Sequence, residues 1–335
     1  MYSQTSAQTS AAFDAIYAKV PTEQVERLKE FRRAHPVKRL TFGDTDWEYI
    51  SCGRAAEQAL LLLPGALSVG ESTFPLITAF ENKYRIIAPS YALSLTITGL
   101  CEGIAHILET EAINRVHVFG GSYGGLVAQY FVRKYPDKAC SLVLSHTFLI
   151  TPKFVKPIKI AGKLLPAVPK ILFVPLMKLR LNKMLLSTLR RAKHPEFEFW
   201  RAYLNEALAS DRLKEVVVHQ NKCLLALARQ PQFTADDLKE WRGKILIIDS
   251  DDDPAIGAKD RALLRETYPQ AEVKTFPDAG HASSILKREE TFSIIRNFLS
   301  RVVSDDECKE LLEKITPENL HGEVDTGNSV GSEAW

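Results

Sequence analysis

Short apolar runs alternate along the chain with longer stretches in which apolar residues recur every three or four positions. Runs of the first kind are typical of buried strands, and stretches of the second kind are typical of helices. Strands are predicted at residues 37–42, 46–51, 59–63, 85–88, 115–119, 140–145, 244–249 and 272–276. Helices are predicted at residues 71–82, 99–110, 258–267 and 284–300. This alternation predicts an α/β fold with a mostly parallel, doubly wound sheet.

The alternation stops between residues 151 and 235, where helical patterns occur without a convincing strand. We therefore expect a helical lid, or cap, inserted over the carboxyl edge of the sheet, where such folds bind ligands. Residues 1–12 and 316–335 are polar and are expected to be disordered or flexible. The predicted organisation is an N-terminal polar segment with helices (1–36), an α/β core (37–150 and 236–300), a basic lid (151–235) and an acidic, partly disordered tail (301–335).

Residues 120–124 read Gly-Gly-Ser-Tyr-Gly, a G-x-S-x-G sequence between a predicted strand and a predicted helix. A serine at this place sits on a sharp, strained turn, and small neighbours are needed because side chains would clash with the strand and the helix. The turn exposes the hydroxyl of Ser122. An ordinary glycine-rich turn is the alternative, since the short motif also occurs by chance, but the flanking elements favour a nucleophile.

A serine nucleophile needs a base, and the base needs an acid that orients it. In α/β-hydrolases these residues follow in the order serine, acid, histidine. Strand 244–249 runs into three aspartates that end at Asp253, and strand 272–276 runs into a Gly-His pair at His281. Both residue types therefore stand where this order requires them.

On these motifs the chain resembles the α/β-hydrolase superfamily, over about residues 37–300. The resemblance implies a triad of Ser122, Asp253 and His281, with Asp253 matching the aspartate of a G-x-x-D-P motif whose glycine is Ser250 here. The aspartates could instead form a solvated turn or a helix cap, and His281 could be a loop histidine. His146, after strand 140–145, is expected to line the pocket rather than to act as the base.

The resemblance also implies an oxyanion hole built from the backbone N–H groups of Ala66 and Tyr123. Relatives usually begin the first of these loops with His-Gly, whereas this chain has Pro64 before the glycine. The Pro-containing loop and the Gly-x-Ser-x-Gly-Gly context weakly resemble the maspardin branch. Members of that branch are discussed as binding proteins as much as enzymes.

We therefore expect a serine hydrolase that acts on carboxylic esters with an apolar acyl group or on other small esters, through an acyl-enzyme on Ser122. A serine rather than an aspartate at this position argues against a haloalkane dehalogenase. The alternatives are a C–C bond hydrolase or an acyltransferase with the same triad, or a non-catalytic maspardin-like binding protein. The expected chemistry needs no metal and no organic cofactor.

Composition narrows the class of protein only slightly. The 335 residues, 45% of them hydrophobic, suffice for one large α/β domain with an insertion. A net charge of +2 gives no global support for nucleic-acid binding. Five scattered cysteines without a CxxC pair favour a reducing compartment. No signal peptide and no long apolar run are recognised, so a cytoplasmic location is expected.

Charge is distributed unevenly, because residues 151–193 contain eleven Lys or Arg residues and no Asp or Glu. Apolar residues are interleaved with these cations. One interpretation is a pocket cover whose lysines face water. The other is an interfacial segment that contacts an anionic membrane peripherally or admits an acidic acyl substrate.

Overall fold

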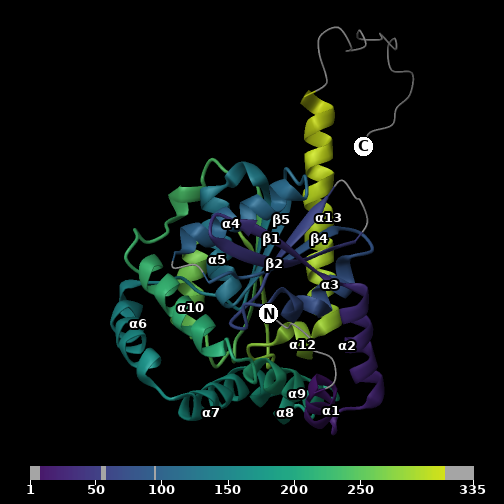
Figure 1. Cartoon of the computed structure of the whole chain (residues 1–335). Coiled ribbons are helices and arrows are strands. Elements are labelled where there is room, and N and C mark those ends of the chain that lie inside the picture. Colours follow the sequence, from purple (N-terminus) through teal and green to yellow (C-terminus); the bar gives the residue numbers. More distant parts are fainter. Residues whose placement is uncertain (1–7, 54–57, 94–95, 314–335) are drawn as a thin grey trace, which may run out of the picture.

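The computed structural model describes residues 8–53, 58–93 and 96–313, with side chains from residue 11 to residue 302 (Figure 1). Its centre is a sheet with the strand order β1-β2-β4-β3-β5-β6-β7-β8. The strands are β1 Val37–Phe42, β2 Thr45–Cys52, β3 Ala59–Leu63, β4 Arg85–Ser90, β5 Val116–Gly121, β6 Ala139–Ser145, β7 Lys244–Ser250 and β8 Glu272–Phe276. β2 is antiparallel to β1 and β4, and all other neighbours are parallel.

Helices cover both faces of this sheet. The first face carries α3 (Phe74–Phe80) and α13 (Arg288–Glu313). The opposite face carries α4 (Ile97–Thr110), α5 (Tyr123–Lys134) and α11 (Ala258–Thr267). The predicted mostly parallel, doubly wound α/β-hydrolase fold is therefore confirmed.

Strand β3 shows why a continuous apolar run was the correct strand signal. Leu60 and Leu62 belong to the core on one face, and Leu61 and Leu63 belong to the core on the other. Successive side chains of a strand point to opposite faces, so a strand covered on both sides has no polar positions. All four leucines are buried.

The segment between β6 and β7 is helical where apolar residues recur with helical spacing. Its α-helices, here called the lid, are α6 Pro152–Leu164, α7 Lys170–Leu181, α8 Ser187–Arg191, α9 Phe197–Leu208 and α10 Leu213–Leu227. A π-helical turn, Asn182–Leu186, joins α7 to α8. None of the helices within the described residues is both long enough and apolar enough to cross a membrane.

The chain ends differ from the expectation. Residues 8–12 were predicted to be disordered, but they begin helix α1 (Gln8–Tyr17). The helix forms because it has a partner: Tyr17 is buried, and its hydroxyl donates a hydrogen bond to Glu206 of α9 at 2.6 Å. At the other end α13 continues through residue 313 rather than ending near 300. The predicted flexible stretch 316–335 lies outside the described residues.

Helix α2 (Thr22–Ala34) ties the lid to the core. Arg32 forms a bidentate pair with Glu71 at 2.8 and 3.0 Å and a second pair with Glu206 at 3.0 Å. Glu71 lies on the short 3₁₀ helix Gly70–Thr73 of the core, and Glu206 lies on α9. Because paired guanidinium and carboxylate groups fix geometry, α9 is held in place over the sheet.

Glu196, just before α9, forms a second tie. It accepts hydrogen bonds from Arg27 of α2 at 2.7 Å, from Arg288 of α13 at 3.0 Å and from the Trp200 indole at 3.1 Å. Burial alone would raise the pKa of Glu196, but the two arginines outweigh it and lower the pKa to about 2. The charged form of Glu196 therefore stabilises the fold.

This pKa shift predicts a pH-dependent stability. A glutamate in the unfolded chain has a pKa of about 4.3, so the stabilisation is complete above about pH 5 and is lost as the pH falls toward 2. Between pH 6 and pH 3 the wild type should lose about 1–2 kcal/mol more unfolding free energy than Glu196→Gln. Urea denaturation at both pH values measures this difference.

The exposed Glu23 of α2 supplies the control. Glu23→Gln should keep the pH dependence of the wild type. An unchanged pH dependence in Glu196→Gln would contradict the assignment.

Candidate active site

Ser122 stands between the end of β5 and the start of α5. Its backbone angles are φ 53° and ψ −117°, which a residue with a side chain rarely adopts. Two contacts hold this strained turn: the Ser122 amide donates to Ser145 O at 2.9 Å, and the Thr147 hydroxyl donates to Ser122 O at 2.8 Å. The conformation is that of the nucleophile elbow expected from the sequence.

The glycines of the motif are required by close packing. A Cβ atom at Gly120 would lie 2.4 Å from Gly124 O, and one at Gly124 would lie 2.2 Å from Leu63 O. At Gly121 the nearest atom would be 3.7 Å away, an ordinary contact. Strand β5 and helix α5 therefore approach each other and β3 more closely than side chains at positions 120 and 124 would allow.

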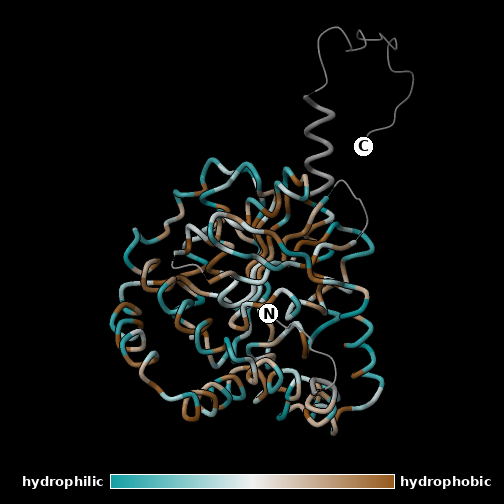
Figure 2. Tube along the Cα trace, viewed as in Figure 1, coloured by the Kyte–Doolittle hydropathy of each residue, from teal (hydrophilic) through white to brown (hydrophobic). Residues whose placement is uncertain are grey.

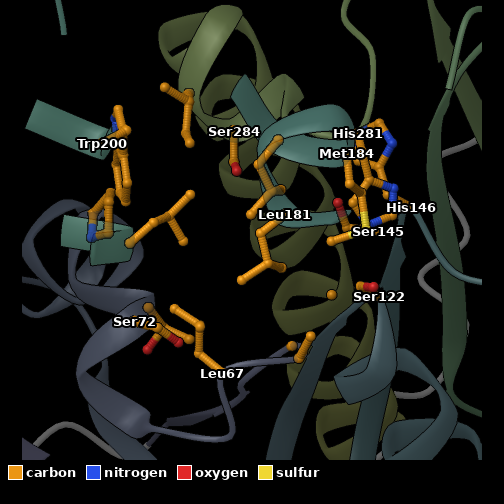
Figure 3. Close-up of a pocket in the computed structure, with 18 of the residues that line it drawn as sticks. Leu67, Ser72, Ser122, Ser145, His146, Leu181, Met184, Trp200, His281 and Ser284 are labelled. Carbon is orange, nitrogen blue, oxygen red and sulfur yellow. The ribbon is translucent and has the colours of Figure 1, made fainter. Parts of the chain in front are cut away.

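Asp253 and His281 meet at the same edge of the sheet, after β7 and β8. The Nδ1 atom of His281 lies 2.8 Å from Asp253 Oδ2 and 3.0 Å from Oδ1, and both residues are buried. The Nε2 atom of His281 is also buried and has no hydrogen-bond partner among the described residues. Figure 3 shows Ser122 and His281 on one cavity wall, although no hydrogen bond joins the two.

The carboxylate of Asp253 accepts hydrogen bonds from four groups. Besides His281, these are the amides of Ala255 at 2.8 Å and Ile256 at 3.1 Å, and His146 Nδ1 at 3.2 Å. Burial alone would raise the pKa of Asp253. The hydrogen bonds from His146 and His281 outweigh burial and hold this pKa well below its usual range.

His146 was not expected to bind the acid. It follows β6, and its amide donates to Ile248 O of β7 at 2.8 Å. Its Nε2 atom lies 2.8 Å from the hydroxyl of the buried Ser283, and burial lowers its pKa. The neutral ring can donate from Nδ1 to Asp253 and accept from Ser283. One feature of the sequence does indicate this contact. His146 follows β6 and Asp253 follows β7, and these strands are parallel neighbours, so both residues lie at the same edge of the sheet.

The two preceding aspartates have other partners. Asp252 accepts from the Gly280 amide at 2.7 Å and pairs with Arg191 of α8 at 2.8 Å. Asp251 is exposed and accepts from the Asp278 amide at 3.3 Å. Of the three aspartates, the one at position 253 is bound to His281, and the others shape the loop that carries this histidine.

The loop after β3 lies directly against Ser122. A Cβ atom at Gly65 would be 3.7 Å from Ser122 Cβ. Gln220 of α10 braces the loop, because its amide donates to Ala66 O at 2.9 Å and to Ser68 Oγ at 2.5 Å. A lid side chain thus holds the loop that begins with Pro64 and Gly65. Tyr123 is the first residue of α5, so its amide has no acceptor within the helix.

The cavity beside Ser122 has a volume of about 180 Å³ and a mainly apolar wall (Figure 3). The core contributes Phe119 and Leu76, and the lid contributes Leu181, Met184 and Leu204. Such a wall suits an apolar group next to the serine.

Two groups of potential metal ligands occur in the described residues: His35, Cys52 and Glu81, and the trio of His146, Asp253 and His281. In the second group the carboxylate is already occupied by two imidazoles and two amides. In the first, His35 Nε2 is 2.6 Å from Glu81, and its Nδ1 faces Phe31 O. Hydrogen bonding within each group accounts for its geometry.

Comparison with known proteins identifies the family of this chain. Residues 60–293 match the model of the alpha/beta hydrolase family. The chain therefore belongs to the α/β-hydrolase family.

Two curated relatives are partial matches. Maspardin of Danio rerio is 30% identical over 131 residues, which cover 37% of this chain and 42% of maspardin. The chain thus matches less than half the length of that relative. Monoacylglycerol lipase ABHD6 of Bos taurus is 23% identical over 225 residues, or 65% of each chain.

Solved structures of low sequence identity share the fold. A thermophilic esterase from Thermogutta terrifontis has a TM-score of 0.63 at 19% identity and covers 80% of this chain and 99% of its own. A meta-cleavage product hydrolase (CumD) has a TM-score of 0.60 at 19% identity and covers 79% of this chain and 98% of its own.

The packing of the elbow predicts opposite effects at two glycines. Gly124→Ala forces a methyl group against Leu63 O and should destabilise the protein by about 1–3 kcal/mol. Gly121→Ala makes only an ordinary contact, 3.7 Å from the Phe119 ring, and should leave stability nearly unchanged. Urea denaturation of both variants tests this, and equal stabilities would show that β3 does not constrain the elbow.

Proposed function

We propose that this protein is a serine hydrolase that cleaves carboxylic esters through an acyl-enzyme on Ser122. One observation carries the proposal: a buried Asp253–His281 pair at 2.8 Å whose free Nε2 atom shares a cavity with a serine on a strained turn. Nucleophile, base and acid are the three parts that acyl transfer requires.

The proposed reaction follows from the hydrogen bonds. The Nδ1–H group of His281 donates a hydrogen bond to the ionised Asp253, and this tautomer leaves a lone pair on Nε2. This nitrogen takes the proton of Ser122 as the serine oxygen attacks the ester carbon, and the imidazolium then protonates the departing alkoxide. A water molecule then gives a proton to His281 and attacks the acyl-enzyme. The ester bond to Ser122 breaks, Ser122 regains its proton from His281, and the carboxylic acid product leaves. The hydrogen bond between Ser122 and His281 is expected to form when substrate binds, as in other hydrolases.

Both His146 and His281 bind Asp253 through Nδ1. The partner of the Nε2 atom distinguishes the histidine that can act as the base. The Nε2 atom of His146 is bonded to Ser283, whereas that of His281 has no partner within the described residues. The base needs a free lone pair, so we assign this role to His281. His146 holds Asp253 from the other side and is a positioning residue.

We assign the oxyanion hole to the amides of Ala66 and Tyr123. The first lies in the loop that Gln220 braces beside Ser122, and the second begins helix α5. Two such donors would stabilise the negative charge of the tetrahedral intermediate. The apolar wall of the cavity favours an ester with an apolar acyl group.

The proposed location is the cytoplasm. The argument for it is the five scattered cysteines, which favour a reducing compartment.

The same residues could instead cleave a C–C bond or transfer an acyl group. An alternative from a different class is a non-catalytic binding protein. The similarity to maspardin over 131 residues is the observation in its favour. The Asp253–His281 pair supports the enzyme. Reaction with a fluorophosphonate distinguishes enzyme from binding protein, because this probe labels only an activated serine.

Ser122→Ala is the first functional test. Loss of the nucleophile should reduce hydrolysis of a short p-nitrophenyl ester by a factor on the order of 10⁶. The change removes one hydroxyl, so the unfolding transition should stay within about 0.5 kcal/mol of the wild type. Mass mapping should place the fluorophosphonate of the wild type on Ser122. Wild-type turnover by the variant would refute the assignment.

Replacement of the acid is the second test. Asp253→Asn removes the charge that stabilises the imidazolium of His281 and should lower kcat by a factor on the order of 10⁴. Asp251→Asn, at an exposed neighbour, is the matched control and should have a much smaller effect. A larger loss in Asp251→Asn than in Asp253→Asn would move the acid to another residue.

A further inference from the structure

The lid exposes apolar side chains on its outer surface. Of the nine large hydrophobic side chains exposed in the described part of the chain, six belong to α6 and α7. The six are Ile160, Leu164, Ile171, Leu172, Leu176 and Leu179, with exposed fractions from 49% to 81%. Figure 1 shows both helices at the outer edge of the molecule, and Figure 2 shows hydrophobic residues along them.

Helix α7 has two apolar faces. Phe173, Met177 and Leu181 recur every four residues and are buried against the rest of the lid. Leu172, Leu176 and Leu179 recur at helical spacing on a different side and are exposed. The inner face explains how α7 is held. The outer face adds nothing to the core.

Positive charge surrounds this apolar surface. All eleven Lys and Arg residues between 151 and 193 are exposed, and no acid occurs in that stretch. Three of the eleven pair with acids elsewhere, through Lys153–Asp260, Lys170–Asp211 and Arg191–Asp252. The other eight form no ion pair with any residue that the structure describes. Most of the charge is therefore available to an external anion.

We propose that the outer surface of α6 and α7 docks on a bilayer that contains anionic phospholipids. Leucines at the helix surface would enter the acyl region while the lysines beside them meet phosphate groups. A second copy of the chain is a poorer occupant, because it would bring eleven more cations against the first eleven. A nucleic acid would use the cations but not the leucines.

The helix that carries the docking surface continues into a segment that lines the cavity. Helix α7 ends at Leu181, and the π-helical turn Asn182–Leu186 follows; Leu181 and Met184 both line the cavity. Helix α9 is tied to the core through Arg32 and Glu206, whereas α7 carries Pro175 inside it, which removes a helical hydrogen bond. The bilayer would therefore contact the part of the lid that adjoins Ser122.

Docking on a bilayer also indicates which esters would reach the cavity. This inference about the substrate rests on the proposed function. An enzyme that docks in this way receives amphiphilic esters with an apolar chain from the bilayer. Hydrolysis of such an ester should rise when it is presented in anionic vesicles. Hydrolysis of a short water-soluble ester should not change.

Co-sedimentation with sucrose-loaded vesicles tests docking without requiring catalysis. The wild type and Ser122→Ala should pellet equally with vesicles of phosphatidylcholine and phosphatidylserine, and neither should pellet with phosphatidylcholine alone. High salt should release both, since screening shortens the reach of surface charge below about 10 Å.

Two sets of variants separate the roles of charge and apolar contact. Each cation near the surface strengthens binding about fivefold, so Lys163→Ala, Lys178→Ala and Arg180→Ala together should weaken it roughly 100-fold. Leu172→Ser, Leu176→Ser and Leu179→Ser together should also lower the pelleted fraction. The matched controls are Lys239→Ala with Arg242→Ala, and Val37→Ser with Val273→Ser, all at exposed positions outside the lid. These should pellet like the wild type.

Each outcome decides between distinct interpretations. Failure to pellet with anionic vesicles, or unchanged pelleting of both lid variants, overturns docking even if the soluble ester is hydrolysed. Pelleting that depends on the lid residues supports docking even if Ser122 proves inactive, and only the proposed function then fails. If light scattering shows a dimer that the leucine variant abolishes, without vesicle binding, the surface belongs to a second copy and the proposal is wrong.

Discussion

The arrangement of the site depends on the hydrogen bonds that the carboxylate of Asp253 accepts. It joins the end of β7 to His281 after β8 and to His146 after β6. The amide of Ser122 is bonded to Ser145 O, one residue before His146, so the strained turn is attached to the same network. Because the strands are parallel, their carboxyl ends meet at one edge, and a single buried anion can link the loops. The hydrogen bonds offset the cost of burying this charge.

A second set of charged contacts fixes only part of the lid. Arg32 joins α2 to the core and to α9, and Glu196 joins the start of α9 to α2 and α13. These ion pairs join segments that lie between 39 and 174 residues apart in the chain, so they fix how the segments are placed relative to one another. Helices α6 and α7 each have one ion pair to another part of the described chain, Lys153–Asp260 and Lys170–Asp211, and both lysines are about half exposed. The other cations of these two helices are exposed.

Local pattern was sufficient to predict the sheet and the elbow. The run of leucines in β3 indicated burial on both faces, and the glycines around Ser122 indicated close packing. Contacts between distant segments could not be predicted in this way. The bond between His146 and Asp253 and the brace from Gln220 join residues that no periodicity connects. The prediction of disorder for residues 8–12 is wrong for the same reason. Their composition is polar, and the helix they begin is stabilised by packing on α9, which lies far along the chain.

Helix α10 contacts both the connection between α6 and α7 and the loop beside Ser122. Lys214 near its start donates to Pro166 O at 2.7 Å and to Val168 O at 2.8 Å, in the connection between α6 and α7. Gln220, further along the same helix, donates to Ala66 O beside Ser122. One helix therefore contacts both the connection between α6 and α7 and the loop that carries the proposed oxyanion amide. The side chain that braces this loop, Gln220, belongs to the lid, so the loop beside Ser122 is held by a contact from outside the core.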